Sequence, residues 1–144
     1  MLNPQAAAGA SAVSGPAEPE GTPRRVLVVD DSVDSVETLA RLLRADGHNV
    51  LTATDGPSAL AIVHSFRPDV VLLDIGLPGM NGYETAMHIR RSPGMAAALL
   101  IALTGYGQDR DRARALEAGF DRHLTKPVDH QMLLRLIQSP RRSA

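Results

Sequence analysis

The most informative segment of this chain for its fold is Val70-Val71-Leu72-Leu73-Asp74. An unbroken apolar run of this length, closed by a carboxylate, is typical of a strand that is buried on both faces of a parallel sheet. A second run, Val26-Leu27-Val28-Val29, has the same character and is followed by Asp30 and Asp31. The sequence therefore predicts a parallel sheet in which these two strands end at acidic residues.

Short apolar runs alternate with amphipathic stretches along the rest of the chain. We expect three more strands near residues 49–53, 99–103 and 121–125, and helices that begin near residues 32–34, 57, 83, 109 and 129. This alternation indicates an α/β fold, with a parallel sheet covered by helices on both faces. In open sheets of this kind, ligands bind beyond the carboxyl ends of the strands.

The 144 residues have room for one domain of ordinary size. Residues 1–23 are rich in Ala, Pro and Gly and contain few large apolar side chains, which predicts a disordered N-terminal tail or linker. The folded domain is expected over residues 24–138. Residues 139–144 are expected to form a C-terminal tail.

Composition argues against several classes of function. The absence of cysteine removes disulfides, thiolate metal sites and thiol nucleophiles. A net charge of −1 gives no sign of a basic surface for nucleic acid. Two Phe, two Tyr and no Trp also argue against a platform on which bases could stack. No apolar run approaches the roughly 20 residues that a membrane span requires, and the N-terminus lacks the features of a secretory signal. We therefore expect a cytoplasmic protein without nucleic-acid or membrane partners.

Five polar residues are expected to meet at the carboxyl edge of the sheet: Asp30, Asp31, Asp74, Thr104 and Lys126. Three ionised carboxylates in one cleft repel one another, so the cluster requires protons or a cation. Mg²⁺, or Mn²⁺ in its place, prefers oxygen ligands and keeps several waters. Asp31 and Asp74 could bind the ion directly, with Asp30 acting through water.

The loop after the strand at residues 70–74 offers a further metal ligand, the backbone carbonyl of Gly76. Such an ion would also offset the charge of a transferred phosphoryl group. The carboxylate of Asp74 is a competent nucleophile toward phosphorus, and attack would give an acyl phosphate. Lys126 and Thr104 would then bind the new phosphoryl oxygens.

Residues 25–138 resemble the receiver domain of two-component response regulators, the CheY-like family. The resemblance rests on four anchors in the family's order: Asp30-Asp31, Asp74 within Leu72-Leu73-Asp74-Ile75-Gly76-Leu77-Pro78-Gly79-Met80-Asn81-Gly82, Thr104 within Ala102-Leu103-Thr104-Gly105, and Lys126-Pro127. The anchors Asp30, Asp74, Thr104 and Lys126 are separated by 44, 30 and 22 residues, which fits the family's pattern. The sequence motifs around Asp74 and Thr104 are also similar to those of receivers attached to hybrid histidine kinases. The initial methionine and the leader slightly favour a free-standing regulator.

The resemblance implies a flavodoxin-like (βα)5 fold with strand order 2-1-3-4-5. It implies a phosphoprotein in which Asp74 accepts a phosphoryl group from a histidine kinase or a histidine phosphotransfer protein. Phosphorylation would switch the surface of the fourth helix, fifth strand and fifth helix, toward a downstream target that the sequence does not name. A regulator of this kind is not an enzyme, beyond its own phosphorylation and dephosphorylation.

Four further positions carry expectations from the family. The switch position, which usually holds Tyr or Phe, is His123, and a histidine there would either make switching sensitive to pH or be an ordinary surface residue. Gly76 and Tyr106 occupy positions that tune the lifetime of the phosphorylated state. The peptide bond before Pro127 is expected to be cis.

Two rival functions follow from the same residues. A Mg²⁺-dependent phosphohydrolase would also form an aspartyl phosphate, although it would need an acid at the position of Gly76. The other rival is a binding module without phosphotransfer. The remaining polar motifs predict surface features: solvated histidines at positions 48, 64, 88 and 130, and a solvated face that includes Arg90 and Arg91.

Overall fold

The computed structural model describes residues 22–105 and 112–139. Its strands all run parallel in one sheet, in the order β2-β1-β3-β4-β5. Their bounds are β1 (Arg25–Val29), β2 (Asn49–Ala53), β3 (Val70–Asp74), β4 (Leu99–Thr104) and β5 (Arg122–Thr125). This architecture confirms the predicted flavodoxin-like α/β fold and its strand order.

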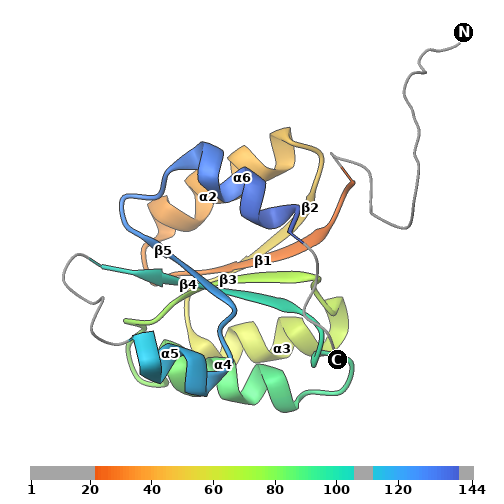
Figure 1. Ribbon diagram of the computed structural model, residues 1–144. Helices are drawn as coiled ribbons and strands as arrows, with labels where there is room; N and C mark the ends of the chain where they lie inside the picture. The colour runs from red at the N-terminus through yellow and green to blue at the C-terminus, as the bar shows by residue number, and fades with distance from the viewer. Residues whose placement is uncertain (1–21, 106–111, 140–144) are drawn as a thin grey trace, which may run out of the picture.

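Helices cover both faces of the sheet, as Figure 1 shows. On one face lie α2 (Val33–Ala45) and α6 (His130–Ile137). The other face is covered by α3 (Gly56–Phe66), α4 (Gly82–Arg91) and α5 (Arg112–Ala118). None of the helices in the described ranges is long and apolar enough to cross a membrane.

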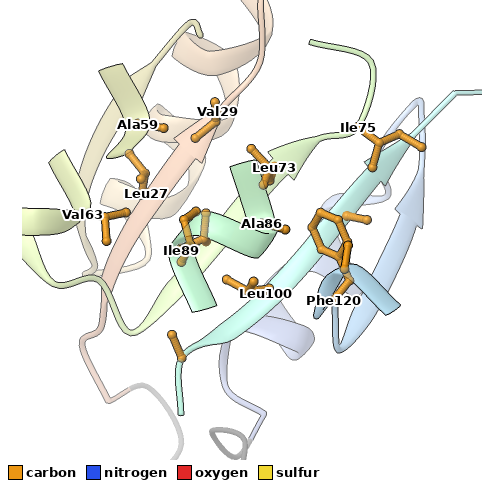
Figure 2. Packing of buried hydrophobic residues seen from close by; sticks show 14 of the residues in the cluster. Leu27, Val29, Ala59, Val63, Leu73, Ile75, Ala86, Ile89, Leu100 and Phe120 are labelled. Carbon is orange, nitrogen blue, oxygen red and sulfur yellow. The ribbon is translucent and has the colours of Figure 1, made fainter. Parts of the chain in front are cut away.

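Two apolar cores fill the spaces between the sheet and these helices. Side chains of β1, β3 and β4 alternate between the two cores, so each strand is buried on both faces. Figure 2 shows part of the core between the sheet and α3, α4 and α5 (the core below the sheet in Figure 1), with Leu27, Val29, Ala59, Val63, Leu73, Ile75, Ala86, Ile89, Leu100 and Phe120 labelled. Every residue of β3 is buried, which explains the unbroken apolar run that ends at Asp74.

Four helices begin at a polar residue whose side chain accepts a backbone N–H of the first turn. These N-cap residues are Ser32, Asp55, Asn81 and Asp129. Asn81 also forms a capping box with Glu84. The first helix begins at Val33, within the predicted range of residues 32–34. The last helix begins at His130, one residue after the predicted start, because Asp129 serves as its cap.

Arg90 does not belong to a solvated face, so that prediction was wrong. Its guanidinium group is mostly buried and lies 2.6 Å from the carboxylate of Asp121. It also donates hydrogen bonds to the carbonyls of Gly119, Met95, Ala96 and Ala98. Arg90 thereby ties the last turn of α4 to the segments that precede β4 and β5. Gly119 and Asp121 lie 29 and 31 residues from Arg90 along the chain, so no local pattern could reveal their approach.

His48 is buried, whereas the sequence predicted a surface position. Its Nδ1 atom accepts a hydrogen bond from the backbone N–H of Arg24 at 3.0 Å. The Nε2 atom lies 3.4 Å from a carboxylate oxygen of Asp46. The ring thus joins the segment before β1 to the turn before β2, and that pairing of distant segments explains the burial.

Replacing Arg90 should destabilise the fold. Arg90→Ala removes several hydrogen bonds to carbonyls and leaves the mostly buried Asp121 carboxylate without this cation, which should lower the free energy of unfolding by about 3 kcal/mol. Urea denaturation followed by circular dichroism measures this change. Arg91→Ala, an exposed neighbour of the same residue type, is the matched control and should change stability by less than about 0.5 kcal/mol. Equal effects of the two substitutions would contradict this role for Arg90.

Candidate functional site

The acidic cluster lies where β1 and β3 end side by side. Val29 of β1 is in register with Leu73 of β3, so the residues that follow each strand meet at the carboxyl edge of the sheet. Asp30, Asp31 and Asp74 each bring a carboxylate oxygen to within 4.8 Å of the other two. The structure therefore brings together the three acids that the sequence singled out.

Two of these acids are buried, and backbone N–H groups hold them in place. Asp30 is 1% exposed, and its Oδ1 atom accepts a hydrogen bond from the N–H of Ser32 at 3.0 Å. Asp74 is 7% exposed, and its Oδ1 atom accepts from the N–H of Gly76 at 2.9 Å. Burial raises the pKa of Asp74, although the Gly76 N–H and nearby Lys126 act in the opposite direction. Asp31 is exposed and faces solvent.

Lys126 supplies the cation that faces the buried acids. Its Nζ atom lies 2.8 Å from Oδ2 of Asp30 and 3.2 Å from Oδ2 of Asp74. Burial lowers the pKa of this ammonium, but its hydrogen bond to Asp30 and the charges of the two acids outweigh burial and raise the pKa overall. Lys126 follows β5 directly, and its backbone N–H donates to the carbonyl of Thr104 at 2.7 Å. The peptide bond between Lys126 and Pro127 is cis.

Thr104 and His123 lie on the neighbouring strands β4 and β5. Thr104 is the last residue of β4 and is buried, and its hydroxyl donates to the carbonyl of Leu124 at 3.4 Å. His123 is half-buried and pairs in register with Ala102. The hydroxyl of Thr104 is thus engaged with β5 rather than with the acids. Tyr106 lies outside the described residues.

Gly82 allows α4 to begin directly against the end of β3. A Cβ atom at this position would overlap the carbonyl oxygen of Asp74 and the Cα atom of Ile75. The N–H of Gly82 also donates to the carbonyl of Ile75 at 3.2 Å. No pattern in the sequence reveals this contact, because the partner depends on the path of the loop in space.

A groove of about 300 Å³ opens beside the acidic cluster. Asp30, a member of the cluster, and Lys126, which faces it, also line the groove. One wall comes from the first turns of α2, and the other from the segment between β5 and α6; the further lining residues are Asp34, Ser35, Thr38, Leu39, Leu103, Pro127, Val128 and His130. The sequence did not predict this groove, because its two walls are nearly a hundred residues apart.

The chemistry of the cluster suits a hard divalent cation. Three ionised carboxylates face one ammonium, which leaves an excess of negative charge in a partly buried site. Carboxylate oxygens are the ligands that Mg²⁺ prefers, and the exposed Asp31 leaves one side of the cluster open to solvent. The same open side would admit a phosphoryl group to Asp74.

Residues 26–138 match the family model of the response regulator receiver domain. The chain belongs to this family. It is 36% identical to protein PilH of Pseudomonas aeruginosa over 115 residues, which cover 80% of this chain and 95% of PilH. It is also 40% identical over 118 residues to the response regulator PleD of Caulobacter vibrioides, covering 80% of this chain but 25% of PleD.

A solved structure similar to this receiver is the receiver domain of sensor histidine kinase PA1611 from Pseudomonas aeruginosa. The two share 30% sequence identity with a TM-score of 0.73, and the match covers 81% of this chain and 96% of the other. That structure holds a magnesium ion in its active site cleft. This chain is accordingly a receiver domain of the kind that response regulators use in two-component signalling.

Removing the charge of Asp74 should stabilise the receiver in metal-free buffer. Because burial raises the pKa of Asp74, the charged carboxyl opposes folding at every pH above its ordinary range near 4. Asp74→Asn should therefore raise the melting temperature at pH 7, and this advantage should shrink as the pH falls toward 4. Added Mg²⁺ should stabilise the unsubstituted protein more than the variant.

Differential scanning calorimetry at several pH values measures this effect. Glu37→Gln removes an exposed carboxylate from α2 and serves as the control, with little expected change. A lower melting temperature for Asp74→Asn than for the unsubstituted protein, at pH 7 without metal, would show that the charge of Asp74 stabilises the fold instead.

Proposed function

We propose that this receiver accepts a phosphoryl group on Asp74. The observation that carries the proposal is the setting of this carboxylate at the end of the central strand. Gly76 orients one of its oxygens, and Lys126 faces the other. In the transfer, a carboxylate oxygen of Asp74 bonds to phosphorus as the phosphorus–nitrogen bond of a phosphohistidine breaks. The histidine nitrogen keeps the electron pair of that bond.

Mg²⁺, or Mn²⁺, is the proposed cofactor of this step. Asp30, Asp31, Asp74 and the backbone carbonyl of Gly76 would hold the ion, Asp30 through water. The bound ion would supply positive charge for the phosphoryl oxygens during transfer. The geometry of the three acids supports this assignment, as does the magnesium ion in the related PA1611 receiver.

Lys126 and Thr104 are the residues that we propose bind the phosphoryl group and respond to it. Lys126 already faces Asp74, and Thr104 would give up its hydrogen bond to Leu124 in order to donate to a phosphoryl oxygen. Loss of that bond would free β5, where His123 holds the switch position. The surface of α5, β5 and α6 would then repack. Gly76 and Tyr106 are the proposed positions that set the lifetime of the phosphorylated state.

The proposed phosphodonor is a histidine kinase or a histidine phosphotransfer protein. A protein donor must bring its phosphohistidine to Asp74, so its surface must cover the groove beside the acidic cluster. The groove presents Asp34, Ser35 and Thr38 from α2, together with His130 from α6. These side chains would contact the donor and contribute to the choice of partner. Residues 24–138 are the proposed working unit.

Asp74→Asn should abolish phosphorylation. The protein is incubated with Mg²⁺ and a small-molecule phosphodonor such as phosphoramidate, and the incorporated phosphate is measured by intact-protein mass spectrometry. The unsubstituted receiver and the Glu37→Gln control should be labelled, and hydroxylamine should release the label because it cleaves acyl phosphates. Labelling of Asp74→Asn at the level of the unsubstituted protein would refute the assignment.

Charge reversal in the groove should slow transfer from a protein donor alone. Asp34→Lys should reduce the rate of transfer from a phosphorylated histidine protein at least about tenfold, which corresponds to about 1.4 kcal/mol. The rate with phosphoramidate should stay unchanged, since Asp34 is not a proposed ligand of the ion. Glu117→Lys, an exposed position on α5 outside the groove, is the control. Equal rates for Asp34→Lys and the control would place the donor elsewhere.

A further inference from the structure

Helix α5 depends on tertiary contacts with the rest of the receiver. It is 7 residues long, which is too short to be stable without tertiary contacts. Among the described side chains of α5, Ala118 lies in the core and Ala115 packs against it, whereas Leu116 is 69% exposed. The helix packs mainly against α4. Its position therefore depends on what the side chains of α4 offer it.

Tyr83 in the first turn of α4 is the aromatic side chain that α5 contacts. The guanidinium carbon of Arg114 lies 4.2 Å from the centre of the Tyr83 ring, which is a cation–π geometry. Tyr83 is 6% exposed and belongs to the core below the sheet, together with Ala118 and Phe120. Arg114 is exposed, so its guanidinium group contacts the ring of Tyr83 from the solvent side, whereas the ring itself is buried.

The same turn of α4 is in rigid contact with the proposed phosphoacceptor. Gly82 precedes Tyr83 and lies so close to the backbone of Asp74 and Ile75 that there is no room for a Cβ atom. Its N–H is also bonded to the carbonyl of Ile75. A displacement of the backbone at the end of β3 must therefore move the first turn of α4, because close-packed contacts of this kind transmit small shifts.

We propose that Tyr83 and Arg114 couple Asp74 to α5. A shift at Asp74 would pass through Gly82 to the ring of Tyr83, and the cation–π contact with Arg114 would carry it to α5. This inference rests on the proposed function, because it needs a phosphoryl group on Asp74 as the signal. It adds a route through the tyrosine ring on α4, which does not pass through His123 on β5.

Movement of α5 along this route would change a surface that a partner can contact. Leu116 and Glu117 are exposed on α5, so a rotation of this short helix alters which apolar and charged groups face solvent. The cation–π contact is directional, since it weakens when the cation leaves the face of the ring. A small movement of Tyr83 can therefore change the balance between two positions of α5.

NMR spectroscopy of the full chain tests the coupling. Mg²⁺ and beryllofluoride, a mimic of the phosphoryl group, are added to ¹⁵N-labelled protein, and the amide shift changes of Gly76 and of residues 113–118 are measured. In the unsubstituted receiver both sets of amides should respond. In Arg114→Ala and Tyr83→Leu the response of α5 should fall by at least half, whereas Gly76 should respond fully.

Conservative variants distinguish coupling between Asp74 and α5 from a purely structural role of Tyr83 and Arg114. Tyr83→Phe keeps the ring and Arg114→Lys keeps the cation, so each should retain the α5 response. Arg91→Ala removes an exposed arginine from the last turn of α4 and should behave like the unsubstituted protein. Arg114→Ala alters only an exposed side chain, which keeps the test valid even if Tyr83→Leu does not fold.

Two results would overturn the inference in different ways. A full α5 response in Arg114→Ala, with Gly76 responding normally, would overturn the coupling and leave the proposed function intact. No response at Gly76 in the unsubstituted receiver would overturn the proposed function, and the coupling would fall with it.

Discussion

The ion pairs of Lys126 with Asp30 and Asp74 are the interaction on which the rest of the site depends. Two buried carboxylates side by side at the ends of β1 and β3 repel each other, and the ammonium of Lys126 is the cation that faces both. Asp31 adds a third carboxylate at the solvent side. The resulting excess of negative charge is what makes the cluster suited to a divalent ion and, with that ion, to a phosphoryl group.

The parallel sheet is what forces these charges together. Its central strands are buried on both faces, so polar side chains are tolerated only where the strands end. Thr104 and Lys126 follow the same rule at the ends of β4 and β5. The proposed switch uses that arrangement, because a phosphoryl group on Asp74 would compete for Lys126 and for the hydroxyl of Thr104, and both groups are bonded to the neighbouring strands.

Much of this could be predicted from the sequence, because apolar runs and the polar residues that end them are local features. The strand order followed from the resemblance carried by the motifs around Asp74, Thr104 and Lys126. The predictions for Arg90 and His48 were wrong because the burial of these side chains depends on contacts that are not local. Arg90 bonds to Gly119 and Asp121, and His48 bonds to Arg24, all of which are distant along the chain. A lone arginine or histidine carries no local sign of such partners.

The sequence alone indicates which residues reach the carboxyl edge of the sheet, because a strand buried on both faces tolerates charged side chains only at its ends. Only the tertiary structure decided how those residues meet. It placed Lys126 between two acids, bonded the hydroxyl of Thr104 to β5, and set Tyr83 against Arg114. These contacts join separate elements, so they depend on the packing of helices against the sheet rather than on any single stretch of sequence.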